Sequence, residues 1–156
     1  MNKQISPNQS WREGVNYSSP VQKVLIFGWY DGPTDGVLQC GDGQVYRFDL
    51  LAWEPATQDL RVFGLFPMPS ASWEQLIAIC GGPGFRWQEQ LRQPIEDVIR
   101  QAGDVEWVVA TEDLQGEILR VKAIRPDELA RVTNWNAFLG LTQEVHDIGP
   151  YLKFEE

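Results

Sequence analysis

The chain has few of the residues that mark most catalytic or metal-binding sites. Its 156 residues include a single histidine, His146, and two cysteines, Cys40 and Cys80, that lie far apart in sequence. A structural zinc site needs four nitrogen or sulfur ligands, and these three residues do not supply them. Any Cys–His or Ser–His mechanism would depend on His146, which lies in an acidic segment typical of a protein surface. The sequence therefore favours a non-enzymatic protein with no cofactor and no bound metal.

Long apolar runs are also missing. Runs such as those at residues 24–27 and 107–110 span only a few residues and fall far short of the roughly 20 that a membrane-spanning helix needs. The polar first residues lack the apolar segment of a secretory signal. We therefore expect a cytoplasmic protein that does not bind membranes, with Cys40 and Cys80 as free thiols because reducing compartments rarely keep disulfides.

Basic residues are scarce relative to acidic ones. The chain has 13 Lys and Arg against 22 Asp and Glu, which gives a formal net charge of −9. Such a charge repels phosphate backbones, so the sequence argues against nucleic-acid binding. A basic protein partner would be attracted, although the same charge also serves solubility alone.

Periodicity and turn residues predict an α+β fold. Residues 1–20 are polar and aperiodic, which is typical of an N-terminal arm, and residues 21–156 form one predicted globular domain. Four strands of an antiparallel meander are predicted over residues 22–27, 36–40, 44–50 and 59–66. Two helices, a second β-hairpin and short C-terminal helices follow, over about 72–80, 91–102, 104–111, 117–124 and 126–132. Strands followed by helices and a hairpin indicate α+β and not a parallel βαβ repeat.

The segment from residue 28 to residue 36 is the first candidate binding site. It contains two Asp-Gly steps and a proline, which are strong turn signals, between two apolar strands. Large aromatic rings at a turn suit binding because they offer rigid contact area. We expect Trp29, Tyr30, Asp31 and Asp35 to contact a basic protein partner. Rings at such positions also commonly just cover the end of a sheet.

Other tryptophans near predicted turns suggest a second site. Trp53 and Trp87, with Arg86, would line a small-molecule cleft between the meander and the helices. A third hypothesis is a symmetric homo-oligomer that buries the aromatic loops against its own copy. The sequence favours the first hypothesis, a protein-binding module of the inhibitor, immunity-like or adaptor kind.

Overall fold

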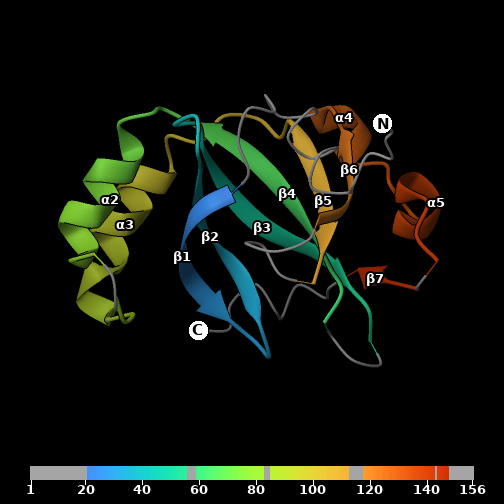
Figure 1. Ribbon diagram of the computed structural model, residues 1–156, viewed down its shortest axis with the longest axis horizontal. Helices are drawn as coiled ribbons and strands as arrows, with labels where there is room; N and C mark the ends of the chain where they lie inside the picture. Colours follow the sequence, from blue (N-terminus) through green and yellow to red (C-terminus); the bar gives the residue numbers. More distant parts are fainter. Residues whose placement is uncertain (1–20, 56–58, 83–84, 113–117, 143, 148–156) are drawn as a thin grey trace, which may run out of the picture.

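A computed structural model describes residues 21–55, 59–82, 85–112, 118–142 and 144–147. The predicted arm at residues 1–20 lies outside this range. The described chain forms an antiparallel sheet with helices at its two ends, in agreement with the predicted α+β class (Figure 1).

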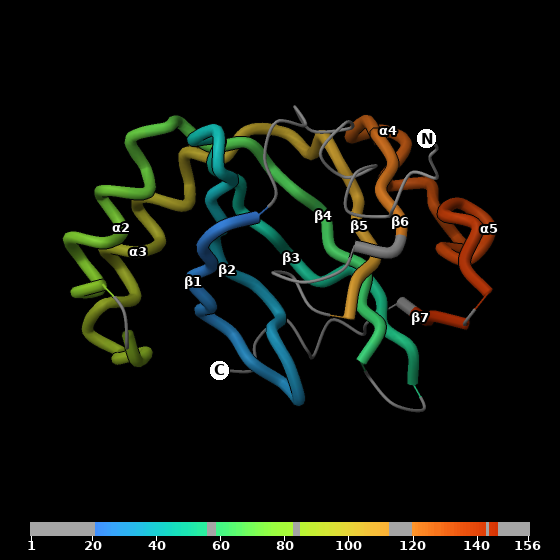
Figure 2. The backbone as a smooth tube through the Cα atoms, in the orientation of Figure 1, coloured from blue at the N-terminus to red at the C-terminus, as the bar shows by residue number. Residues whose placement is uncertain are grey.

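The first six strands form a meander in which each pairs with its neighbour along the chain. Its strands are β1 (Val21–Trp29), β2 (Pro33–Cys40), β3 (Val45–Trp53), β4 (Arg61–Met68), β5 (Trp107–Thr111) and β6 (Ile118–Ala123). The short strand β7 (His146–Asp147), which the sequence did not predict, pairs with β3 beyond the point where β2 ends. The tube trace shows the β1–β2 turn at the same end of the sheet as the last residues of β3 and the first residues of β4 (Figure 2).

Alternating side chains give the sheet two apolar faces, as expected for strands buried on both sides. One face is continuous from β1 to β6 and has Phe48 and Phe63 at its centre, with ring centroids 5.4 Å apart and ring planes at 89°. We call it the inner cluster. Its buried members are Val21, Leu38, Cys40, Tyr46, Phe48, Leu50, Phe63, Leu65 and Val109.

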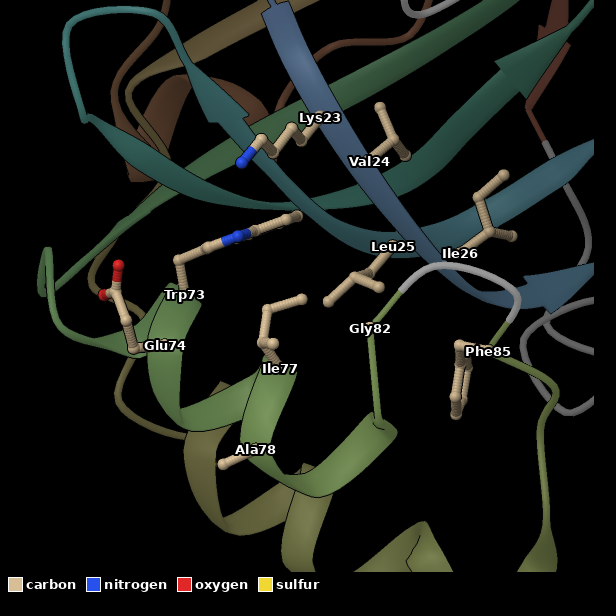
Figure 3. A pocket seen from close by; sticks show the side chains of 10 residues that line it. All are labelled: Lys23, Val24, Leu25, Ile26, Trp73, Glu74, Ile77, Ala78, Gly82 and Phe85. Atoms are coloured by element: carbon tan, nitrogen blue, oxygen red, sulfur yellow. The ribbon is translucent and has the colours of Figure 1, made fainter.

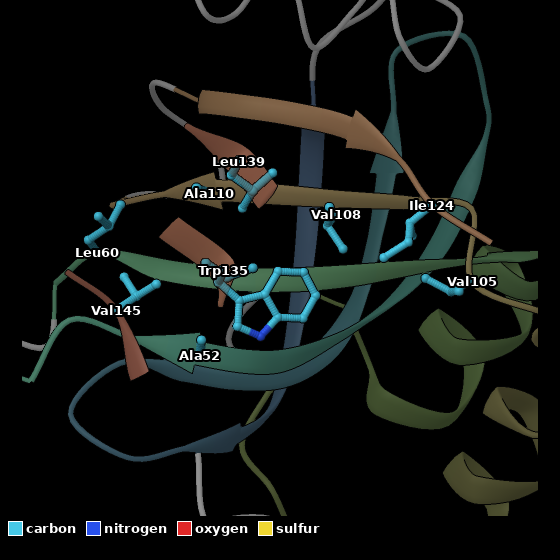
Figure 4. Close-up of a cluster of buried hydrophobic side chains, with 10 residues drawn as sticks. Ala52, Leu60, Val105, Val108, Ala110, Ile124, Trp135, Leu139 and Val145 are labelled. Carbon is cyan, nitrogen blue, oxygen red and sulfur yellow. The ribbon is translucent and has the colours of Figure 1, made fainter. Parts of the chain in front are cut away.

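The opposite face is covered by helices in two separate places. Helices α2 (Ser72–Cys80) and α3 (Arg92–Ile99) pack over β1 and β2, and a 3-10 turn, η1 (Glu89–Leu91), leads into α3. Helices α4 (Pro126–Leu129) and α5 (Trp135–Leu139) cover the β4–β5 side, where the Trp135 indole lies among the buried side chains of the sheet (Figure 4). Among the described residues, no helix is long and apolar enough to cross a membrane.

A bulge near the end of β3 changes which face its last residues occupy. The register of the β3–β4 pair shifts between Leu50 and Ala52. Leu50 belongs to the inner cluster, whereas Ala52, two residues later, packs with the helices on the other face. The extra residue therefore returns Trp53 to the inner cluster.

Truncation of Phe63 tests the continuity of the inner cluster. We expect Phe63→Ala to lower the free energy of unfolding by about 3–5 kcal/mol, because it leaves a cavity beside Phe48. Urea unfolding followed by circular dichroism measures the loss. The control, Trp29→Ala, removes an exposed ring and should cost less than about 1 kcal/mol. Equal losses in the two variants would contradict this packing.

Candidate functional site

The turn between β1 and β2 carries the most exposed aromatic rings of the described chain. Trp29 is 58% exposed and Tyr30 is 39% exposed. No other large apolar side chain among the described residues is exposed. We call Trp29–Gly32 the tip. Its main chain closes tightly, since the Tyr30 N–H donates to the Gly32 carbonyl at 2.8 Å.

A buried arginine on β4 holds the tip in place. Arg61 is only 3% exposed, and it reaches across to the turn with both arms of its guanidinium. Nη1 donates to the Pro33 carbonyl at 3.0 Å, and Nη2 donates to the Tyr30 carbonyl at 2.7 Å. Burial lowers the pKa of Arg61, while the negative charges of Asp31 and Asp59 act in the opposite direction.

The tip's backbone is shaped around that guanidinium. Gly32 has φ +144°, and a Cβ at this position would lie 2.9 Å from Cζ of Arg61, so glycine is required for both reasons. Asp31 has φ +55°, a left-handed conformation that short polar side chains tolerate. The turn therefore has one well-defined shape.

Trp53 joins the tip to the inner cluster. The Tyr30 and Trp53 rings lie 5.6 Å apart at 31°, and Cζ of Arg61 lies 5.2 Å from the centre of the Trp53 ring. Tyr30 thus packs on the Trp53 ring, and that ring lies beside the buried guanidinium of Arg61. The sequence had assigned Trp53 and Tyr30 to different sites, and the structure brings them together.

Asp35 lies on the helix-covered face of the sheet, opposite Gly28 in the β1–β2 pair. It sits opposite Asp49 in the β2–β3 pair, and Asp49 forms an ion pair with Arg47 at 2.8 Å. The Thr34 hydroxyl donates to the Asp35 carboxylate at 3.0 Å. Burial is the main cause that raises the pKa of Asp35, and the hydrogen bond from Thr34 opposes it. Asp35 is therefore half-buried beside Gly28, whereas Trp29, Tyr30 and Asp31 are exposed.

The expected cleft of Trp53, Arg86 and Trp87 does not form. Trp87 packs on Phe27, with ring centroids 6.2 Å apart, in the cluster under α2 and α3, whereas Trp53 belongs to the inner cluster on the opposite face. Arg86 is exposed. The β3 bulge is the physical reason, because it turns Trp53 to the face away from the helices.

The structure shows a groove that the sequence did not predict. It has a volume of about 820 Å³ and runs between strand β1 and helix α2 (Figure 3). Residues 23–26 of β1 form one wall, and the helix contributes Trp73, Glu74, Ile77 and Ala78. We call it the β1–α2 groove. The apolar run at 24–27 was the available signal, but sequence alone did not show that a helix stands opposite this strand.

The two thiols and the histidine lie in different environments. Cys40 and Cys80 are both free, and burial raises the pKa of Cys40 to about 12 and also raises that of Cys80. His146 lies exposed on β7, with Nε2 3.4 Å from a Glu144 carboxylate oxygen. Within the described ranges, no group of three or more His, Cys, Asp or Glu gathers in a way that would hold a metal ion.

Comparison with protein-family models, curated proteins and solved structures finds no match for this chain. Any statement of function therefore depends on the geometry of the chain itself.

Replacement of Arg61 tests whether it fixes the tip. We expect Arg61→Met to lower the free energy of unfolding by about 2–4 kcal/mol, because the Tyr30 and Pro33 carbonyls lose their donors. Amide exchange at residues 30–32 should also accelerate. Arg125→Met, which removes an exposed arginine, is the control and should leave both measurements nearly unchanged. Unaltered exchange at the tip in Arg61→Met would refute the assigned role.

The raised pKa of Asp35 gives a pH-dependent prediction. The folded chain binds this proton more tightly than the unfolded chain, so wild-type stability falls as pH rises from about 4 through the folded-state pKa. Asparagine does not titrate, and Asp35→Asn should gain stability over wild type as pH rises from 4 to 7. Urea unfolding across this range measures the difference, and a constant difference would contradict the prediction.

A variant whose stability should change with pH in the opposite direction serves as the control. Arg92 lowers the pKa of Glu89 through a hydrogen bond, with Nε 2.7 Å from the carboxylate. Glu89→Gln should therefore lose stability relative to wild type as the pH rises, by a small amount because the pair is exposed.

Proposed function

We propose that the chain is a cytoplasmic, non-enzymatic protein-binding module that presents its β1–β2 tip to a basic partner protein. The observation that carries the proposal is an exposed tryptophan on a turn whose backbone is fixed by a buried arginine. The free thiols of Cys40 and Cys80 fit a reducing compartment.

The rigidity of the tip favours binding over simple coverage of the sheet. A large ring that is already ordered loses little conformational entropy when a partner covers it, and tryptophan and tyrosine are enriched among residues that dominate binding energy. Trp29 covers little of its own fold, since more than half of its surface faces solvent. Tyr30, by contrast, is partly supported by Trp53 and forms the base of the contact.

Charge around the tip defines the partner. Asp31 in the tip and Asp59 near Arg61 are both exposed, and the whole chain carries a net charge of −9. This arrangement attracts a basic surface, raises the association rate and makes binding sensitive to salt. An inhibitor, immunity-like or adaptor protein that covers a basic site fits these properties.

Native mass spectrometry of the tagged protein, purified from its source cell at low salt, tests the proposal. We expect a stoichiometric basic companion that the wild-type chain retains and that dissociates as salt increases. The variant Trp29→Ala with Asp31→Asn should lose the companion, since asparagine keeps the turn conformation at position 31.

A second double variant controls for charge. Asp97→Asn with Asp104→Asn removes two exposed acids elsewhere and should keep the companion. A companion held equally by both double variants would show that the tip is not the site. A bare monomer would contradict a stable partner, and a homo-oligomer would instead favour the hypothesis that the tip packs against a second copy.

A further inference from the structure

The β1–α2 groove runs along the edge of strand β1. Its β1 wall consists of four consecutive residues, Lys23 to Ile26. Successive side chains of a strand point to opposite faces, so a pocket that touches four in a row must lie against the strand's edge and its main chain. Figure 3 shows β1 passing over the pocket with α2 facing it.

β1 is an end strand of the sheet. Of the described strands, only β2 pairs with it. In an antiparallel pair, every second residue of an edge strand directs its N–H and C=O away from the partner. The groove therefore offers main-chain donors and acceptors in addition to apolar side chains.

The two edges of the sheet differ in their protection. Proteins commonly block strand addition by placing charges on edge strands. β6, at the other edge, carries the exposed Arg120 and Lys122, and the Lys122 ammonium donates to the Phe138 carbonyl of α5 at 3.2 Å. β1 carries one charge, Lys23, followed by an uninterrupted apolar run from Val24 to Phe27. Between its bulges at residues 21–23 and 26–29, β1 is thus the less charged of the two edges.

The far wall of the groove suits the side chains of an added strand. Trp73 is buried at its base, and Ile77 and Ala78 continue the apolar surface along one side of α2. Phe85, held edge-on against Phe27 at 5.9 Å, adds a further apolar surface. Lys23 and Glu74 are the charged side chains among the described lining residues, so an acidic residue of the occupant would pair with Lys23.

We propose that the β1–α2 groove binds an extended segment of a partner protein, which adds to β1 as an antiparallel or parallel strand. The segment has apolar residues at alternate positions that face α2, and an acidic residue beside Lys23. A strand advances about 3.3 Å per residue, so residues 23–26 match a segment of four or five residues. This site is separate from the tip and does not depend on the function proposed for it.

A phage-displayed library of random ten-residue peptides, selected against the immobilised full chain, tests the proposal. We expect enriched peptides with alternating apolar residues and an acidic residue. Fluorescence polarisation measures the affinity of the synthetic peptides. Methylation of every second backbone nitrogen should lower this affinity at least tenfold when the methylated nitrogens are those that face β1. Methylation of the intervening nitrogens should change it little. Only hydrogen bonding of the peptide backbone to a strand edge gives this alternation.

Variants of the chain locate the bound peptide. Ala78→Trp fills the groove from an exposed helical position, and Lys23→Glu reverses its cation, so each should weaken peptide binding at least tenfold. Ala137→Trp, on the exposed side of α5, is the matched control and should bind as wild type does. The tip variant Trp29→Ala with Asp31→Asn should also bind normally, which separates this test from that of the tip. Circular dichroism confirms that each variant is folded.

Three results would overturn the proposal. The first is a selection without enrichment, and the second is enriched peptides whose affinity Ala78→Trp leaves unchanged. The third is a wild-type dimer in sedimentation that Ala78→Trp converts to a monomer, because the groove would then belong to a second copy of the chain.

Discussion

The shape of the tip depends on one buried cation. Arg61 lies on β4, yet two of its hydrogen bonds end on carbonyls of the β1–β2 turn, on the far side of β3. A guanidinium out of water is stable only when its donors are satisfied and its charge is compensated, and here carbonyls, an aromatic ring and nearby carboxylates meet those needs. The exposed Trp29 owes its fixed position to this arrangement.

Local patterns in the sequence were sufficient to predict most elements of the fold. The alternation of Tyr46, Phe48 and Leu50, and the apolar stripe of Trp73 and Leu76, reflect packing that each segment imposes on its own residues. The pairing of β7 with β3 and the reach of Arg61 to the turn join residues far apart in sequence. No periodicity encodes such contacts, so the sequence could not predict them.

The candidate sites were predicted less well than the fold, for a reason visible in β3. An unbroken alternation would place Trp53 on the same face as Asp49, beneath the helices and towards Trp87. One inserted residue at the bulge reverses that assignment and brings Trp53 to Tyr30. Asp35 differs in another way. Its position two residues before Val37 puts it on the helix-covered face of the sheet, half-buried beside Gly28, so its carboxylate is less open to a partner than that of Asp31.

Net charge and apolar exposure act together in this chain. An exposed tryptophan and an open strand edge are both liabilities for self-association, and a small domain carrying both would tend to aggregate. A net charge of −9 makes copies of the chain repel one another while leaving approach by a basic or neutral partner unhindered. Acidic residues at the tip add to this field and strengthen the attraction of a basic partner. The described lining of the groove has one charge of each sign, so the net charge should change the affinity of its occupant little. Salt should therefore affect partners of the two surfaces differently, which follows from where the charges lie and not from the apolar contacts themselves.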